Sequence, residues 1–282
     1  MLNKQYDCFI GCDKEYNQAK TVLFGAPFDS TTSYRPGTRF APKAIRNESY
    51  GIETYSPYQD RDLSDIEIMD SGNLDLPFGN TMRVLKIIEE TITGILSDRK
   101  KPLMIGGEHL ISLGGIRAAY KKYSDLHIIQ FDAHCDLRDN YIGEQLSHAS
   151  VMRRAWEILG DGRIFQFGIR SGERTEFEFA KEHTFLRKFN LSGLDNIITA
   201  LKNKPVYFTL DLDVLDTSVF PGTGTPEAGG IGFTELIEAI KKLKNLNIVG
   251  CDMNELCPVY DTSGASTAAA CIILRELLLS IN

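Results

Sequence analysis

Short, nearly continuous apolar runs alternate with amphipathic segments along almost the whole of this sequence. Runs typical of strands cover residues 21–27, 66–70, 102–107, 126–133, 163–169, 205–213 and 247–253, with a shorter one at 184–187. Segments with a helical spacing of apolar residues lie at about 80–98, 110–122, 149–159, 173–182, 192–203, 233–244 and 263–280. Strands that are buried on both faces lose the polar–apolar alternation, so the pattern indicates a parallel sheet between helical layers. We therefore predict a single α/β domain over residues 1–282, a three-layer α/β/α sandwich with an eight-stranded, mostly parallel sheet.

Composition and charge exclude several classes of protein. The chain is 43% hydrophobic and 24% charged, as in folded globular proteins. It has neither a run of roughly 18 apolar residues nor the apolar core of a signal peptide, so we expect no membrane span and a cytoplasmic protein. The net charge of −7, without a long basic run, disfavours nucleic acid as a partner and suits a small cationic molecule. The 6 cysteines lack zinc-binding spacing, and we expect them to be reduced.

Two connections are longer than is usual between strands and helices. They cover residues 27–65 and 214–231, and we interpret both as long loops. Long ordered loops in compact α/β domains are often functional. Ligand sites in such folds lie at the carboxyl ends of the parallel strands, so we expect the site there.

Carboxylates follow two of the predicted strands at alternate positions. The sequence FDAHCD places Asp132, His134 and Asp136 at the end of one strand, and a second strand ends in Asp211 and Asp213. Alternate residues of an extended chain point to the same side, so these side chains are expected to converge. Neither run contains a lysine or arginine. Because isolated buried carboxylates are costly, a bound cation is expected.

A third strand runs into the sequence GGEH, which adds His109 to the set. Its neighbour Glu108 is expected to point away from His109 and not to bind metal. Two histidines and four aspartates without an essential thiolate favour Mn²⁺ over a thiolate zinc site. Four carboxylates suit two divalent ions, which at about 3.5–4 Å apart would hold a bridging hydroxide for hydrolysis. Two divalent ions, four carboxylates and one hydroxide together carry a net negative charge, which favours a guanidinium or ammonium substrate.

Several motifs resemble those of a known family. GGEH, FDAHCD and TLDLDVLDTSVFPGTGTPEAGG resemble the three sequence motifs of the ureohydrolases, which include arginases and agmatinases. GAPFDSTTSYRPGTRFAPKAIR (25–46) resembles the family's N-terminal loop, and YIGEQLSHASVMRR is most similar to bacterial and archaeal agmatinases. The resemblance implies the arginase–deacetylase fold and two Mn²⁺ per subunit. It also implies hydrolysis of agmatine to putrescine and urea by a metal-bridging hydroxide, in a homo-oligomer (trimer or hexamer).

The resemblance also assigns residues to roles. For one manganese ion it implies the ligands His109, Asp132, Asp136 and Asp211. For the second it implies Asp132, His134, Asp211 and Asp213, so that Asp132 and Asp211 bridge. The implied catalytic residues are Asp136, His148 as general acid or proton shuttle, and Glu255 as the group that binds the substrate.

The residues alone support these last two roles less strongly. The sequence by itself favours a solvent-facing cap for His148, although a pKa near 6.5 suits proton transfer and the family resemblance favours that role. Glu255 follows a strand, where its carboxylate could accept two guanidinium N–H bonds. Asp252 ends the same strand, and we interpret it as a support for a ligand rather than a ligand.

Substrate identity rests partly on Arg138, two residues past Asp136. An unpaired arginine there would repel the distal ammonium of agmatine, and we expect Asp139 and Glu144 to neutralise it. The alternatives are another guanidino substrate (arginine, 4-guanidinobutyrate or 3-guanidinopropionate), a zinc deacetylase of the same fold, and a polyamine-binding protein on a degenerate scaffold. The intact ligand set disfavours the last of these, and two occupied metal sites would exclude the deacetylase.

Overall fold

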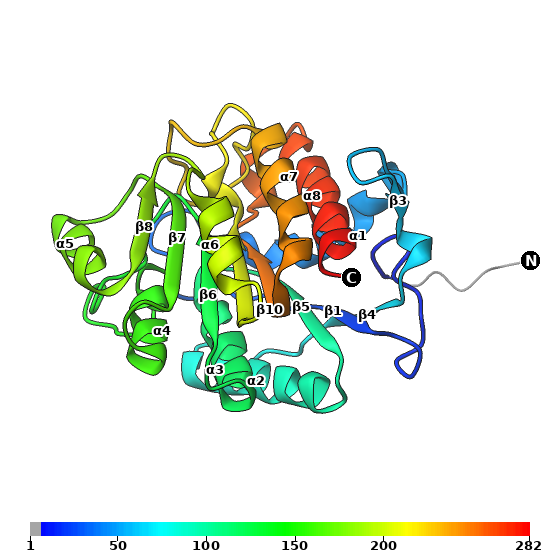
Figure 1. Cartoon of the computed structure of the whole chain (residues 1–282). Coiled ribbons are helices and arrows are strands. Elements are labelled where there is room, and N and C mark those ends of the chain that lie inside the picture. Colours follow the sequence, from blue (N-terminus) through cyan, green and yellow to red (C-terminus); the bar gives the residue numbers. More distant parts are fainter. Residues whose placement is uncertain (1–6) are drawn as a thin grey trace, which may run out of the picture.

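The centre of the molecule is a parallel sheet, seen in a computed structural model that describes residues 7–282 (Figure 1). The sheet has 8 strands in the order β4-β1-β5-β10-β9-β6-β7-β8, and each neighbouring pair is parallel. The strands are β1 (Thr21–Gly25), β4 (Ile68–Asn73), β5 (Lys101–Ile105), β6 (His127–Phe131), β7 (Ile164–Ile169), β8 (Phe185–Lys188), β9 (Pro205–Asp211) and β10 (Asn247–Asn254). The predicted eight-stranded α/β fold is confirmed.

Helices cover both faces of the sheet (Figure 1). One layer contains α2 (Thr81–Ser97), α3 (Ser112–Lys122), α4 (Val151–Leu159) and α5 (Arg174–His183). The other layer contains α1 (Ala41–Glu48), α6 (Leu194–Leu201), α7 (Phe233–Lys242) and α8 (Ala265–Ile281). Among residues 7–282, no helix combines the length and the apolar character that crossing a membrane requires.

Burial on both faces explains the continuous apolar runs. In β9, Val206 and Phe208 belong to the hydrophobic cluster under α7 and α8, whereas Tyr207 between them belongs to the cluster under α2 and α3. Side chains therefore alternate between the two faces, as strand geometry requires, but both faces are dry. The polar–apolar alternation is lost because neither face is in contact with water.

The order of the strands brings the motif-bearing segments together. β5, β10, β9 and β6 are consecutive neighbours in the sheet, and all run in the same direction. Their carboxyl ends consequently meet at one edge, where GGEH follows β5, FDAHCD spans the end of β6, and Asp211 ends β9. At this edge Asn254 pairs with Asp211, which places the following Glu255 next to the aspartates.

One expectation about the connections is wrong. The segment 27–65 is not a plain loop, because it contains the helix α1 and a small antiparallel pair, β2 (Tyr55–Ser56) with β3 (Arg61–Asp62). A helix of 8 residues gives too little periodicity to be recognised, and Pro42 in its first turn is also typical of a turn. All the helices and all eight strands that the sequence predicts are present, with ends shifted by a few residues.

Candidate metal centre

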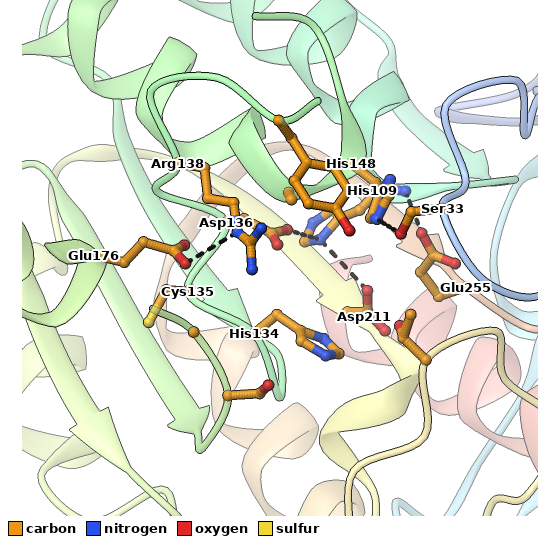
Figure 2. Close-up of a pocket in the computed structure, with 15 residues that line it drawn as sticks. Ser33, His109, His134, Cys135, Asp136, Arg138, His148, Glu176, Asp211 and Glu255 are labelled. Atoms are coloured by element: carbon orange, nitrogen blue, oxygen red, sulfur yellow. Dashed lines mark hydrogen bonds and ion pairs between the residues drawn. The ribbon is translucent and has the colours of Figure 1, made fainter. Parts of the chain in front are cut away.

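The structure brings the six predicted metal-binding residues together at the carboxyl edge of the sheet. Figure 2 shows four of them: His109, His134, Asp136 and Asp211. Two groups of three side chains each lie close enough to share an ion. One group is His109, Asp132 and Asp211, and the other is Asp132, His134 and Asp213. Asp132 belongs to both groups, so its carboxylate lies between two candidate metal sites.

The first candidate site is centred on the Nδ1 atom of His109. This nitrogen lies 2.9 Å from Oδ2 of Asp132, 3.0 Å from Oδ2 of Asp136 and 3.5 Å from Oδ2 of Asp211. His109 is 1% exposed and Asp132 is fully buried. Three carboxylates from two strands thus converge on one buried imidazole nitrogen.

The second candidate site lies on the other side of Asp132. Nδ1 of His134 is 2.9 Å from Oδ2 of Asp213 and 3.6 Å from Oδ1 of Asp132. The other carboxylate oxygen of Asp213 accepts a hydrogen bond from the backbone N–H of Ala133, at 3.0 Å. That bond fixes Asp213, two residues past the end of β9, against the segment that follows β6.

The hydrogen bonds of His109 show that this set suits a cation. The hydroxyl of Thr209 donates to Oδ1 of Asp252 at 2.6 Å, so toward His109 Nε2, 2.8 Å away, it acts as an acceptor. In the neutral ring the proton therefore lies on Nε2, and Nδ1 turns a lone pair toward the carboxylates with no hydrogen-bond partner. A lone pair facing carboxylates is repulsive unless a cation lies between them, and imidazole metal ligands are commonly oriented in this way. Asp252 contacts the Thr209 hydroxyl and not His109 itself, which is the arrangement expected of a residue that supports a ligand.

Electrostatics lead to the same conclusion. Burial, together with the neighbouring Asp132 carboxylate, raises the pKa of Asp136 to about 7. Burial also raises the pKa of Asp211, with Asp213 and Asp132 adding to the effect. Within residues 7–282, the only basic side chains within 4 Å of the four aspartate carboxylates are the two histidines, and no lysine or arginine pairs with them. Divalent ions would supply the missing positive charge, so the donor set fits the two metal ions that the sequence predicts.

Two of the predicted catalytic residues have a left-handed backbone. Asp136 has φ 53° and Glu255 has φ 67°, a region that residues with side chains seldom occupy. Such strain persists only where the surroundings impose it, and it often occurs at functional sites. Glu255 is held by a hydrogen bond from the backbone N–H of His109 to its Oε1, at 2.7 Å.

A cavity of about 170 Å³ opens beside these side chains (Figure 2). Its wall includes both histidines of the candidate sites, Asp136, Asp211 and Glu255, together with His148, Ser33 and Arg138. Arg138 lies in the wall beside Asp136, so a small molecule bound here would be near both the carboxylates and this guanidinium (Figure 2). Cys135 also lies in the wall, and burial raises the pKa of its thiol.

His148 lies at the cavity in a defined orientation. Its Nδ1 is 2.9 Å from the backbone oxygen of Thr31, which accepts only, so the proton is on Nδ1. Its Nε2 is then an acceptor for the hydroxyl of Ser33, at 3.2 Å. Burial lowers the pKa of His148 to about 4. The side chain is thus neutral near pH 7, with Nε2 able to take up a proton.

The expected neutralisation of Arg138 is present, but its partners are not those predicted. Nε of Arg138 lies 3.3 Å from Oε2 of Glu176, and Nη1 lies 3.3 Å from Oε1 of Glu173. Asp139 instead pairs with Arg154, at 2.9 Å. Glu173 and Glu176 lie at the beginning of α5. The connection after β7 brings this end of the helix beside the loop that follows Asp136. The two segments are far apart in the sequence, so their contact could not be predicted from sequence spacing.

Sequence reasoning did not identify several residues around the site. Thr31 and Ser33 belong to the 25–46 segment, in which no sequence pattern distinguishes them from their neighbours. The Arg138 guanidinium lies over the ring of Tyr141, with its Cζ atom 4.5 Å from the centre of that ring. Glu227 lies in the Gly-rich loop, 3.8 Å from Nε2 of His134. No spacing rule points to these side chains, because loops far apart in the sequence bring them to the site.

Comparison with known proteins gives extensive matches. Residues 19–280 match the profile of the Arginase family. An agmatinase of Bacillus subtilis is 48% identical over 275 residues, covering 96% of this chain and 95% of that protein. A solved structure of a provisionally assigned agmatinase from Clostridium difficile is 52% identical with a TM-score of 0.93, covering 95% of this chain and 98% of the other. The agmatine ureohydrolase structure from Thermoplasma volcanium is 34% identical with a TM-score of 0.90, covering 99% and 95%.

Proposed function

The chain belongs to the arginase family, and we propose that it is an agmatinase, which hydrolyses agmatine to putrescine and urea. Agmatinases of three Bacillus species and of Halalkalibacterium halodurans are 44–48% identical to it over nearly their full length. The observation that carries the proposal is the pair of candidate metal sites sharing Asp132, beside a cavity lined by Glu255 and His148.

The proposed metal ligands are divided between the two sites. His109, Asp132, Asp136 and Asp211 hold one ion, and Asp132, His134, Asp211 and Asp213 hold the other. Manganese fits the mixture of carboxylate oxygens and imidazole nitrogens. When bound, the two ions supply a water activated for attack near neutral pH and neutralise the carboxylates.

Glu255 orients the substrate. Its carboxylate faces the cavity and can accept two N–H bonds from a planar guanidinium, which directs the guanidinium carbon toward the metal centre. Asp136 lines the same cavity, and accepts N–H bonds from the guanidinium as its carbon becomes tetrahedral. Both carboxylates are held by their surroundings, so little reorganisation is needed when the substrate binds.

His148 transfers the proton. The Thr31 carbonyl holds the ring proton on Nδ1, so Nε2 accepts the proton that the hydrolysis releases and passes it to the departing amine. The low pKa that burial gives His148 keeps it unprotonated before the reaction. Proton transfer by a positioned side chain commonly contributes about 10²–10⁴-fold to rate.

The charge around Arg138 supports an ammonium-tailed substrate. Two glutamates pair with this guanidinium, so the Arg138–Glu173–Glu176 cluster carries a net negative charge. A carboxylate tail, as in 4-guanidinobutyrate, would find no unpaired arginine there. The cationic tail of agmatine meets no net positive charge.

Urea release tests the proposal directly. Manganese-loaded protein is offered agmatine, arginine, 4-guanidinobutyrate and 3-guanidinopropionate separately. We expect kcat/KM for agmatine to exceed the others by at least about 100-fold. A preference for a carboxylate-tailed substrate would show that Arg138 binds that group, and no urea from any substrate with two metals bound would contradict the assignment.

Two further features of the proposal concern the assembled enzyme. Metal analysis of protein purified without added metal tests manganese as the native ion. The homo-oligomer implied by the family resemblance is tested by light scattering, which separates a monomer of 31.5 kDa from a trimer or hexamer.

A further inference from the structure

Glu108 is a buried carboxylate that binds neither candidate metal. It is fully buried and precedes the ligand His109, yet its side chain turns away toward the segment after β1. Oε2 accepts hydrogen bonds from the backbone N–H of Thr31 at 2.9 Å and the hydroxyl of Thr32 at 3.1 Å. Oε1 accepts one from the hydroxyl of Thr31 at 2.7 Å. Its own backbone N–H donates to the oxygen of Phe28, at 2.8 Å.

Thr31 in turn makes two contacts with His148. Its hydroxyl oxygen accepts the backbone N–H of His148 at 3.1 Å, and its carbonyl oxygen accepts Nδ1–H of the ring at 2.9 Å. The two residues are 117 positions apart in the sequence. Thr31 is therefore the link between the strand-end segment that contains Glu108 and the loop that contains His148.

The direction of each hydrogen bond is defined. The Thr31 hydroxyl has one proton, which it donates to Oε1 of Glu108, so toward the backbone N–H of His148 the hydroxyl oxygen is the acceptor. The carboxylate offers several lone pairs to the three donors that converge on it, whereas an amide would turn its NH₂ group toward at least one of them. A carboxylate at position 108 thus orients Thr31, and the orientation of Thr31 sets that of His148.

We propose that Glu108, acting through Thr31, is a positioning residue that holds His148 with its proton on Nδ1 and Nε2 turned into the cavity. The proposal rests on the proton-transfer role given to His148 above. Glu108 does not touch the substrate. Glu108 acts on His148 only through Thr31. The hydroxyl of Thr31 can be removed by substitution without changing any of the proposed metal ligands.

The chain offers a matched set of variants. Thr31→Val removes the bridging hydroxyl and keeps the side-chain shape, and Thr31→Ser restores the hydroxyl. Thr32→Val is the control, because Thr32 bonds to Glu108 but no hydrogen bond joins it to His148 in residues 7–282. Glu108→Gln tests the carboxylate itself, and its melting temperature and metal content show whether the fold survives.

Steady-state kinetics on manganese-loaded protein with agmatine provide the first readout. We expect Thr31→Val to lower kcat by about 10- to 100-fold with KM within threefold, because small misplacements of a catalytic group are costly whereas binding is unaffected. Thr31→Ser and Thr32→Val should stay within threefold of the wild type. Equal kcat for Thr31→Val and Thr32→Val would overturn the proposal.

The second readout does not depend on turnover. Long-range ¹H–¹⁵N spectra report which ring nitrogen carries the proton, and the His148 signals are identified by their loss in His148→Asn. We expect an Nδ1–H ring in the wild type and in Thr32→Val, and a mixture of tautomers in Thr31→Val. An unchanged ring in Thr31→Val would contradict the positioning role. If the wild type releases no urea from agmatine, the proposed function fails, and these spectra still decide whether Thr31 holds His148.

Discussion

The guanidinium of Arg138 is paired with Glu176, Nε to Oε2 at 3.3 Å, at the wall of the cavity (Figure 2). Glu176 is buried, and its carboxylate also accepts the backbone N–H groups of Leu137 at 2.9 Å and Glu173 at 2.8 Å. Its charge is therefore fixed in place by three donors. Glu173 pairs with the same guanidinium and is more exposed than Glu176. Glu173 is therefore the residue to substitute when the charge around Arg138 is to be changed.

We predict that Glu173→Gln shifts substrate preference toward carboxylate-tailed compounds. Loss of one of two carboxylates leaves Arg138 with more uncompensated charge, so the ratio of kcat/KM for 4-guanidinobutyrate to that for agmatine should rise about 3- to 10-fold. The same assay on Glu178→Gln is the control, because Glu178 is an exposed glutamate of the same helix and does not line the cavity. Equal ratios in the two variants would show that the Arg138 cluster does not sense the substrate's tail.

We predict that Thr209→Val weakens manganese binding. The variant removes the acceptor that holds the His109 ring proton on Nε2, and changes to such supporting groups typically cost about 10- to 100-fold in metal affinity. Calorimetric titration of the metal-free protein with Mn²⁺ measures the effect. Thr223→Val is the matched control, because Thr223 is also buried but its hydroxyl has no hydrogen-bond partner within residues 7–282. Unchanged affinity in Thr209→Val would contradict the role given to the Thr209 hydroxyl.

We predict that His148 makes folding stability depend on pH between about 6.5 and 4. Burial lowers its pKa to about 4 in the folded protein, so the unfolded chain binds the proton first as the pH falls. The stability due to the neutral buried ring is therefore complete above pH 6.5 and is lost on acidification. From pH 7.5 to pH 5 the loss amounts to about 2 kcal/mol.

Denaturant unfolding of metal-free protein at the two pH values measures this effect. The free energy of unfolding of the wild type should fall by about 2 kcal/mol more than that of His148→Asn, which lacks the titrating ring. The aspartates contribute equally to both proteins and cancel in the difference. Parallel changes in the two proteins would contradict the neutral, buried state of His148.

The strands, most helices and the six candidate ligands could be predicted from sequence because each depends on local pattern. Burial on both faces leaves continuous apolar runs, and parallel strands bring their carboxyl ends to one edge, so Asp132 and Asp211 could be placed together. The partners of Arg138 could not be predicted, because Asp139 is nearer in sequence but turns to Arg154. The Glu108–Thr31–His148 link likewise joins three distant segments, and no periodicity marks it.

The carboxylate of Asp132 lies between the two candidate metal sites, and the Asp132→Asn variant tests most directly whether it binds both ions. Metal content and urea release from agmatine are measured on the same preparations, with Asp139→Asn, an exposed aspartate nearby, as the control. We predict two manganese ions per chain in the wild type and the control. Asp132→Asn should bind fewer than two and lose at least about 100-fold in kcat. An Asp132→Asn protein with two ions and full turnover would contradict the account.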